Sequence, residues 1–278
     1  MPPNTRRPGP LNGSLQGDPF DLDEGDANAP LGVRAPVAAE PGSGHSDSFL
    51  NRFGGDDVLI PALPDISLGS LQLDSAIVAA AGKEWDRWNS PVKLTERMVD
   101  ARKIVKTYWK VGVDLDFTDQ EIKDKTWEDD HPWSAAFISY IMRVAGAGDR
   151  FAYAIAHWVY IRWAIKNRLE KRDFPFKAYR LNEVVPEPGD LVGMARSGSG
   201  ADYDNIQKNS YKTHCDIVTE VNKGEIVTIG GNVGDSVSKT KVPLDKTGHI
   251  AKAHYFVIIK VEGLVPFDIT TGGDTRIA

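Results

Sequence analysis

Hydrophobic residues recur at helical spacing between residues 74 and 169 of the chain and at strand spacing further along it. Four segments carry apolar side chains three or four positions apart, which is typical of amphipathic helices. They are residues 74–88, 92–109, 132–145 and 151–169. Beyond Phe174 the period shortens to two, which predicts strands. These are residues 191–195, 214–221, 225–229, 236–242 and 255–261. Helices followed by an antiparallel sheet predict an α+β fold with the helices packed on the sheet.

Turn residues punctuate this pattern at several of the predicted boundaries. Pro132 suits the first turn of a helix, where a missing N–H is tolerated, and Gly146 is a typical helix end. Pro188-Gly189-Asp190 precedes the first of these predicted strands, and Asn222-Lys223-Gly224 is a hairpin signal. A polar loop is predicted over residues 197–212.

The two ends of the chain have a different composition from the patterned region. Residues 1–56 are rich in Pro, Gly, Asp and Ser, and such a segment buries too little apolar surface to offset the entropy of ordering. We therefore expect a flexible N-terminal arm. Residues 57–74 form a partly ordered linker in this interpretation, residues 75–262 the folded domain, and residues 263–278 a C-terminal tail.

Composition and charge narrow the class of protein. The chain has 278 residues, is 41% hydrophobic and carries a net charge of −6. It has no Lys/Arg-rich run, so we expect no nucleic-acid partner. We expect no transmembrane segment, because no apolar run reaches about 18 residues, and no Sec signal peptide, because the N-terminus lacks an apolar stretch. One cysteine permits no internal disulfide, and the histidine spacing fits no metal motif. We assign no metal and no cofactor.

Three short segments carry residues of the types found in catalytic triads. Ser134 lies in Pro-Trp-Ser-Ala-Ala-Phe, at the start of a predicted buried helix. His214 lies in Thr-His-Cys-Asp-Ile-Val at the start of a strand, and Asn232 follows the next strand in Gly-Gly-Asn. A nucleophile, a base and an orienting amide in this order predict the triad Ser134, His214 and Asn232. The alternative for Ser134 is an ordinary first-turn serine that accepts from backbone N–H groups.

Four neighbouring residues are accessory candidates. Asp216 shares a strand face with His214 and is either an orienting carboxylate or a solvated one. Cys215 faces the other side, where a buried, structural thiol is expected. His157 lies in the middle of the aromatic-rich helix predicted over 151–169. It is either a hydrogen-bonded core histidine or a side chain that reaches the site. Trp133 precedes the serine.

These motifs resemble those of papain-like cell-wall amidases of the NlpC and CHAP type. In that group a cysteine starts a buried helix, a histidine heads a strand, and a polar residue follows on the neighbouring strand. The chain is most similar to a bacterial domain-of-unknown-function family, number 2272, over roughly residues 76–261. The resemblance implies a papain-like domain in which Ser134 replaces the nucleophilic cysteine, with His214 and Asn232 as its partners.

The function that the resemblance implies is hydrolysis of amide or peptide bonds, with bacterial peptidoglycan peptides as the substrate. Such an enzyme without a Sec signal requires another route from the cytoplasm to the periplasm or wall. A dedicated secretion machine or a lysis event would serve, and an antibacterial effector or toxin would also need an immunity or delivery protein. The alternative is an inactive papain-like module that binds cell-wall peptide or a protein partner.

Overall fold

The computed structural model describes residues 72–124 and 127–262. The predicted arm, most of the predicted linker and the predicted tail lie outside these residues. The helices are α1 (Leu73–Asn89), α2 (Val99–Val113), α3 (Trp127–Asp130), α4 (Ser134–Val144) and α5 (His157–Leu169), with 3-10 turns η2 (Glu121–Lys123) and η3 (Gly148–Arg150). The strands are β1 (Phe176–Tyr179), β2 (Leu191–Ala195), β3 (Thr213–Asn222), β4 (Glu225–Gly230), β5 (Ser238–Pro243) and β6 (Tyr255–Val261).

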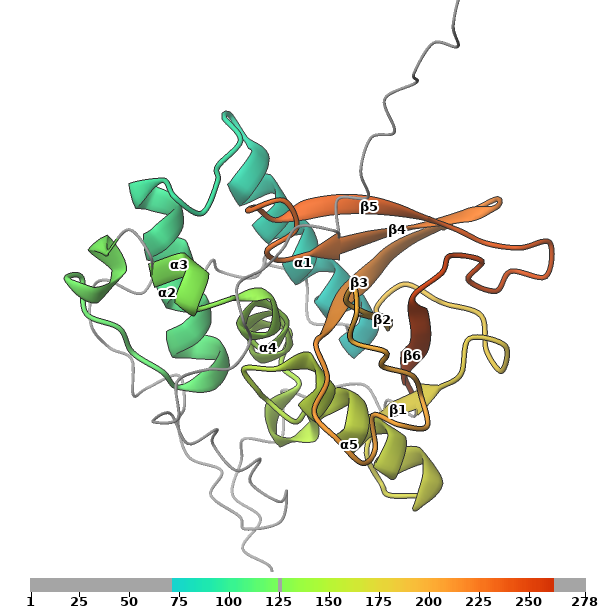
Figure 1. Ribbon diagram of the computed structural model, residues 1–278. Coiled ribbons are helices and arrows are strands. Elements are labelled where there is room, and N and C mark those ends of the chain that lie inside the picture. The colour runs from blue at the N-terminus through green and yellow to red at the C-terminus, as the bar shows by residue number, and fades with distance from the viewer. Residues whose placement is uncertain (1–71, 125–126, 263–278) are drawn as a thin grey trace, which may run out of the picture.

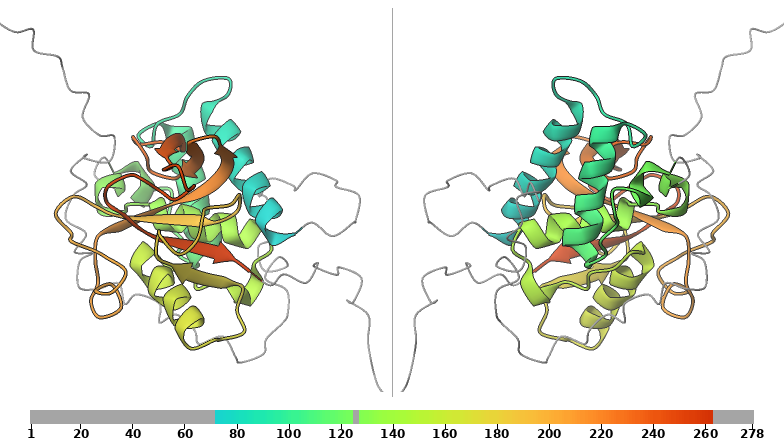
Figure 2. Two further views of the ribbon diagram at one scale, coloured as in Figure 1. Left: turned by 90° about the vertical axis from the view of Figure 1, so that its right-hand side faces the viewer. Right: turned by 90° about the vertical axis from the view of Figure 1, so that its left-hand side faces the viewer.

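The six strands form one antiparallel sheet with the order β1-β6-β2-β3-β4-β5. Strand β3 lies in the interior of the sheet, where it pairs with β2 on one side and β4 on the other. Helix α4 lies between α2 and the sheet, and α5 packs beside β1 (Figures 1 and 2). The α+β class predicted from the sequence is therefore confirmed.

Alternation along β3 divides its side chains between two hydrophobic clusters. Cys215 and Ile217 join the larger cluster, which the helices share. Val218 joins a smaller cluster on strands β2 to β6, against which Leu181 and Val184 pack. This division follows from the period of two, since successive strand residues point to opposite faces.

Helix α4 is held close to α2 by small residues on both sides. A Cβ atom added to Gly112 would lie 2.7 Å from the carbonyl oxygen of Ala136 and 2.8 Å from the amide nitrogen of Tyr140. Any larger residue at position 112 would force the two backbones apart. The approach fixes α4, and with it Ser134 at its first position, against the rest of the domain.

Two predicted helix boundaries are wrong. Helix α2 begins at Val99 rather than at residue 92, because the preceding segment is tied elsewhere: the amide of Glu96 donates to the carbonyl of Asp235 at 2.8 Å. Helix α5 begins at His157 rather than at residue 151. In the segment before it, the hydroxyl of Ser139 donates to the carbonyl of Ala154 at 3.0 Å and accepts from its amide at 3.2 Å. These side-chain bonds replace the helical ones.

The Pro188-Gly189-Asp190 turn has a structural role at the start of β2. Gly189 has φ +94°, and a Cβ atom there would lie 2.6 Å from the Cβ of Asp74, so only glycine fits. Asp190 is buried and pairs with Lys260 at 2.8 Å, while its other bond comes from the amide of Glu187 at 2.7 Å. This turn therefore joins α1 to the sheet.

None of the helices among residues 72–124 and 127–262 is long and apolar enough to cross a membrane.

Candidate functional site

Ser134 is the first residue of α4, and its hydroxyl faces an imidazole. Its Oγ atom lies 2.7 Å from Nε2 of His157, and the side chain is 5% exposed. The N-cap residue Trp133 makes no side-chain capping bond. The hydroxyl is thus engaged with a histidine, whereas the alternative interpretation had it bonded to backbone N–H groups.

His157 is the first residue of α5, so two helix N-termini meet at the Ser134–His157 bond. Its other ring nitrogen, Nδ1, is hydrogen-bonded to the hydroxyl of Tyr160, one turn further along the helix. Tyr160 in turn is hydrogen-bonded to the thiol of Cys215 on β3. A continuous chain therefore runs from Ser134 through His157 and Tyr160 to the sheet.

This chain has a definite direction if Ser134 donates its proton. Nε2 of His157 must then accept, which leaves the proton of the neutral ring on Nδ1, where it is donated to the oxygen of Tyr160. The hydroxyl of Tyr160 is then free to donate to the sulfur of Cys215. The two middle groups, His157 and Tyr160, then each accept one hydrogen bond and donate one, as a nucleophile–base–orienter arrangement needs.

Burial sets the protonation states along this chain. It lowers the pKa of His157 well below the ordinary value, and the positive charge of the nearby Arg196 lowers it further. Burial raises the pKa of Tyr160 well above its ordinary value, with Cys215 and Asp216 adding to the effect. The pKa of the Cys215 thiol is raised by burial and then by Asp216, although the bond from Tyr160 opposes this. At neutral pH the imidazole, the phenol and the thiol are all uncharged.

His214 belongs to a second, adjoining group. Its Nε2 lies 2.9 Å from Oδ1 of Asp216, and its Nδ1 lies 3.1 Å from Nη2 of Arg196. An arginine can only donate and a carboxylate can only accept, so the arrangement fits a neutral ring with its proton on Nε2. The His214 and His157 rings lie 5.0 Å apart, between centroids. The two histidines are therefore neighbours in one site.

The observed contacts differ from the predicted triad, in which His214 would bond directly to Ser134. Both ring nitrogens of His214 have other partners, and His157 is the imidazole that contacts the serine. The reason is the late start of α5, which moves His157 from mid-helix to the helix N-terminus beside Ser134. Asp216 is placed as the sequence suggests for an orienting carboxylate, since it shares a strand face with His214 and is fully buried.

The two glycines of the Gly-Gly-Asn segment make room for this site. A Cβ atom on Gly230 would lie 1.8 Å from Oδ1 of Asp216, and one on Gly231 would lie 2.4 Å from the ring of Phe137. Larger residues would displace the Asp216 carboxylate and the first turns of α4. The hydroxyl of Thr228 also donates to Asp216, at 3.2 Å.

Asn232, the predicted third member of the triad, lies in the turn after β4. It is half-buried and has φ 59°, a left-handed conformation that asparagine tolerates better than most residues. The hydrogen bonds described here connect His214 to Asp216 and Arg196, and His157 to Tyr160. Asn232 therefore has a conformational role in a turn, and its catalytic role stays a prediction.

The remaining accessory candidates, Cys215 and Trp133, are both fully buried. Cys215 contacts Tyr160, as described above. Trp133 stacks on Trp88, with ring centroids 5.0 Å apart, and donates from its indole nitrogen to Glu96 at 2.8 Å. It therefore anchors the start of α4.

Sequence reasoning missed Tyr160 and Arg196. Tyr160 lies three positions after His157, which is the spacing of neighbours on one helix face, so that pairing had a readable signal. Arg196 follows β2 in the chain, and its approach to His214 depends on the pairing of β2 with β3. Its role had no local signal.

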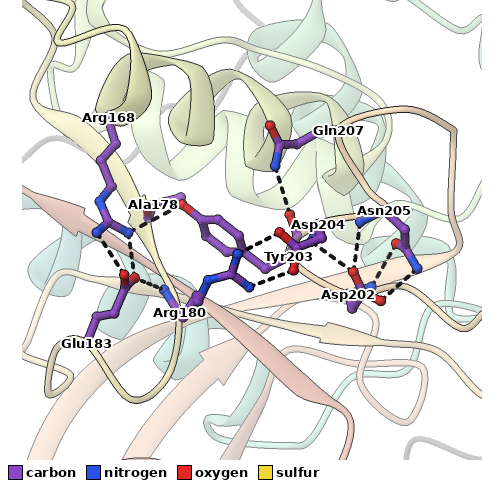
Figure 3. A network of polar contacts seen from close by, with 9 residues as sticks. All are labelled: Arg168, Ala178, Arg180, Glu183, Asp202, Tyr203, Asp204, Asn205 and Gln207. Atoms are coloured by element: carbon purple, nitrogen blue, oxygen red, sulfur yellow. Dashed lines mark hydrogen bonds and ion pairs between the residues drawn. The ribbon is translucent and has the colours of Figure 1, made fainter.

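The loop between β2 and β3 connects Arg196 to the strand that carries His214, and it is firmly attached to the domain. Arg180 binds Asp204 through two bonds of 2.9 and 2.6 Å, and the hydroxyl of Tyr203 donates to the carbonyl of Ala178 at 2.9 Å (Figure 3). From α5, Arg162 donates to the carbonyls of Ile206 at 3.0 Å and Asn209 at 2.6 Å. The loop that carries Arg196 at one end and His214 at the other is thus fixed against α5 and β1.

Within residues 72–124 and 127–262, no group of three or more His, Cys, Asp or Glu side chains could hold a metal ion. The chemistry available to these residues is proton transfer and nucleophilic attack by the Ser134 hydroxyl. In addition, the first N–H groups of α4 have no acceptor within their own helix, so they can stabilise an oxyanion.

Comparison with protein families assigns the chain to a bacterial group. Residues 96–265 match the family described as "Uncharacterized protein conserved in bacteria (DUF2272)". The chain belongs to this family, and the matched range includes all the site residues described above. No curated protein and no solved structure matches the chain.

Proposed function

We propose that the protein is a serine-dependent hydrolase of amide or peptide bonds, with Ser134 as nucleophile and His157 as general base. The observation that carries the proposal is the 2.7 Å bond between Ser134 Oγ and His157 Nε2 at two converging helix N-termini. Tyr160 holds the His157 ring by its Nδ1 atom. This is the logic of a nucleophile whose base is oriented by a third group.

The proposed reaction has two stages, which are formation of an acyl-serine and its hydrolysis. Ser134 Oγ bonds to the carbonyl carbon while its proton moves to Nε2 of His157, and the carbonyl oxygen becomes an oxyanion beside the first N–H groups of α4. The carbon–nitrogen bond then breaks, and His157 gives its proton to the leaving amine. Water repeats these steps on the acyl-serine, with His157 again taking and returning one proton, and releases the acid.

The substrate class rests on resemblance and on family. The likeness of the Ser134 and His214 motifs to those of NlpC and CHAP amidases favours a papain-like domain that acts on cell-wall peptides. Membership of a bacterial family is consistent with that substrate. In this proposal His214 and Asp216 have a supporting role beside His157. The His214 ring is held in place because its two nitrogens contact Asp216 and Arg196.

A second candidate function is favoured by the burial of the site. Ser134, His157 and His214 are 5%, 4% and 1% exposed, and the low pKa of His157 weakens it as a base. A domain that binds wall peptide without cleaving it would tolerate both features. The two candidates differ in one measurable respect, which is the reactivity of the Ser134 hydroxyl.

The test combines a covalent probe with a substrate digest. The full chain is treated with a fluorophosphonate, which phosphonylates activated serines with loss of fluoride, and the labelled residue is located by mass spectrometry. We expect labelling at Ser134 and loss of labelling in Ser134→Ala and His157→Ala. The unmodified chain should release peptide fragments from purified peptidoglycan, and these two variants should not.

Ser75→Ala is the matched control, because Ser75 also lies in the first turn of a helix but is exposed. It should label and digest as the unmodified chain does. A Ser134 hydroxyl that stays unlabelled, together with no fragment release, would support the binding module instead.

A further inference from the structure

The connection between α1 and α2 exposes apolar side chains to solvent. Val92, Met98 and Val99 are 67%, 42% and 70% exposed, and they are three of the six exposed large hydrophobic residues among residues 72–124 and 127–262. This connection lies at the top of both views in Figure 2. Exposed apolar side chains that gather in one place typically mark a contact surface. We call these three residues the Val92 patch.

The same connection is firmly bonded to the rest of the domain. The hydroxyl of Ser236 donates to the carbonyl of Leu94 at 2.9 Å, and the amide of Glu96 donates to the carbonyl of Asp235 at 2.8 Å. The Glu96 carboxylate also accepts from the indole of Trp133 at 2.8 Å. The Val92 patch is therefore presented by a segment that is already held in place, as a binding surface should be.

The small size of the Val92 patch favours an occupant from the same chain. A stable interface between separate proteins buries about 1,200–2,000 Å² in total, which is far more than three apolar side chains supply. A tethered segment needs much less contact, because its tether keeps it near the surface at an effective concentration on the order of mM.

The chain contains a segment of matching composition directly before α1. Residues 57–71, which lie outside the described residues, have two aspartates, no lysine or arginine, and many aliphatic side chains. The aliphatic residues are Val58, Leu59, Ile60, Leu63, Ile66, Leu68 and Leu71. Residues 90–103, around the Val92 patch, have four basic and two acidic side chains. The charges of the two segments are thus −2 and +2, so they attract each other.

Residues 57–71 are long enough to reach the Val92 patch. Helix α1 has 17 residues and is therefore about 26 Å long, and it separates residue 72 from the patch. A fully extended stretch of these preceding residues spans up to about 50 Å. The route along α1 has open places, since Val78 and Ala79 are partly exposed and a Cβ atom on Gly82 would meet nothing within 4 Å.

We propose that residues 57–71 fold back along α1 and dock on the Val92 patch of the same molecule. Their aliphatic side chains cover Val92, Met98 and Val99, and their aspartates lie near the basic side chains of residues 90–103. This docking needs no hydrolytic activity, so it stands or falls separately from the function proposed above.

Photo-cross-linking of the full chain tests this docking. Leu63 is replaced by the photoreactive amino acid benzoylphenylalanine, the protein is irradiated, and the cross-linked residues are located by mass spectrometry. We expect cross-links from position 63 to residues 92–99. A mixture of unlabelled and ¹⁵N-labelled chains distinguishes cross-links within one chain from those between two, and we expect no mixed pairs.

Two substitutions and a matched control test the role of the Val92 patch. Val92→Ser combined with Val99→Ser should lower the yield of this cross-link at least roughly threefold, because two apolar contacts are lost. Leu169→Ser is the control, since Leu169 is a 59% exposed residue at the end of α5. It should leave the yield unchanged. Benzoylphenylalanine in place of Leu31, in the Pro- and Gly-rich region, should show no preference for residues 92–99.

Four results would overturn the inference. They are cross-links from position 63 that avoid residues 92–99, an undiminished yield in the double variant, equal cross-linking of residues 92–99 from position 31, and mixed-isotope pairs. The last result would show that a second copy of the chain, rather than the same molecule, provides the occupant of the Val92 patch.

Discussion

Two buried polar clusters lie on either side of α4, and they are built differently. In the first, Glu84 of α1 accepts from the hydroxyls of Tyr108 on α2 and Tyr140 on α4. In the second, Ser134 and His157 meet at the starts of α4 and α5. We call these the Glu84 cluster and the Ser134 cluster.

The difference lies in where each cluster stands on its helices. Residues of the Glu84 cluster occupy helix interiors. One carboxylate accepts hydrogen bonds from two phenol hydroxyls, so the cluster joins three helices without an unpaired donor among these groups. The Ser134 cluster occupies helix starts, where N–H groups and the positive end of the helix dipole are available to a reacting group. Burial thus serves packing in one case and, in the function proposed above, proton transfer in the other.

The largest expected effect separates the two histidines. His157→Ala should lower the rate of Ser134 labelling by roughly 10³-fold or more, because removal of a general base disables the pair. His214→Ala should lower it by roughly 10-fold, since His214 acts through its neighbours. Stopped-time labelling with a fluorophosphonate measures both. If His214→Ala is the more damaging, the base is His214, and the triad Ser134, His214 and Asn232 is restored.

The sequence predicted the elements that carry the site better than the contacts within it. Alternation over residues 214–221 predicted a strand close to β3, and the Pro132 signal predicted a helix over residues 132–145 with Ser134 in its first turn, close to the observed start of α4. Both signals are local, because each depends on residues a few positions apart.

The partner of Ser134 could not be predicted in this way. The apolar pattern of residues 151–169 is continuous, and it does not reveal that the Ser139 hydroxyl bonds to the backbone of Ala154, which lies outside the helix. That contact between separate segments sets the start of α5 and so brings His157 to Ser134. The resemblance to papain-like amidases favoured His214 instead. Such a resemblance gives the position of a motif in the sequence but not the contacts around it.

A stability measurement tests the packing role of the Glu84 cluster. Glu84→Ala leaves two buried phenol hydroxyls without their acceptor, which should lower the free energy of unfolding by roughly 2–4 kcal/mol. Glu84→Gln keeps one acceptor oxygen and should cost less. Urea denaturation followed by tryptophan fluorescence measures these changes. Ser134→Ala is the comparison and should cost about 1 kcal/mol; an equal or larger cost would show that the Ser134 cluster also serves packing.

A pH series tests another buried carboxyl, Asp190, which pairs with a cation instead of phenols. Burial raises its pKa from 3.8 to about 6, against the opposing effect of Lys260. The folded state therefore binds the proton more tightly than the unfolded state. The stability from this group is fully present below about pH 3.8 and is lost as pH rises through about 6.

Asp190→Asn should accordingly show a smaller fall in unfolding free energy between these pH values than the unmodified chain. Urea midpoints taken at several pH values provide the comparison. Glu187→Gln is the control, because Glu187 contacts the same Lys260 at 2.5 Å but is 67% exposed. Identical pH profiles for Asp190→Asn and the unmodified chain would contradict a raised pKa.

The smallest expected effect concerns Asn232, which separates a turn residue from a member of the site. Its φ of 59° is strained for residues with a Cβ atom, so Asn232→Ala should cost about 1 kcal/mol of stability, whereas Asn232→Gly should change it by less than about 0.5 kcal/mol. If Tyr160 orients His157, both variants should label at Ser134 within about threefold of the unmodified rate, a difference of about 0.6 kcal/mol at most. The two variants remove the same amide and differ only in backbone strain. A common loss of labelling in both, as large as that of His157→Ala, would therefore place the Asn232 amide in the catalytic site, whereas a loss in Asn232→Ala alone would reflect the turn.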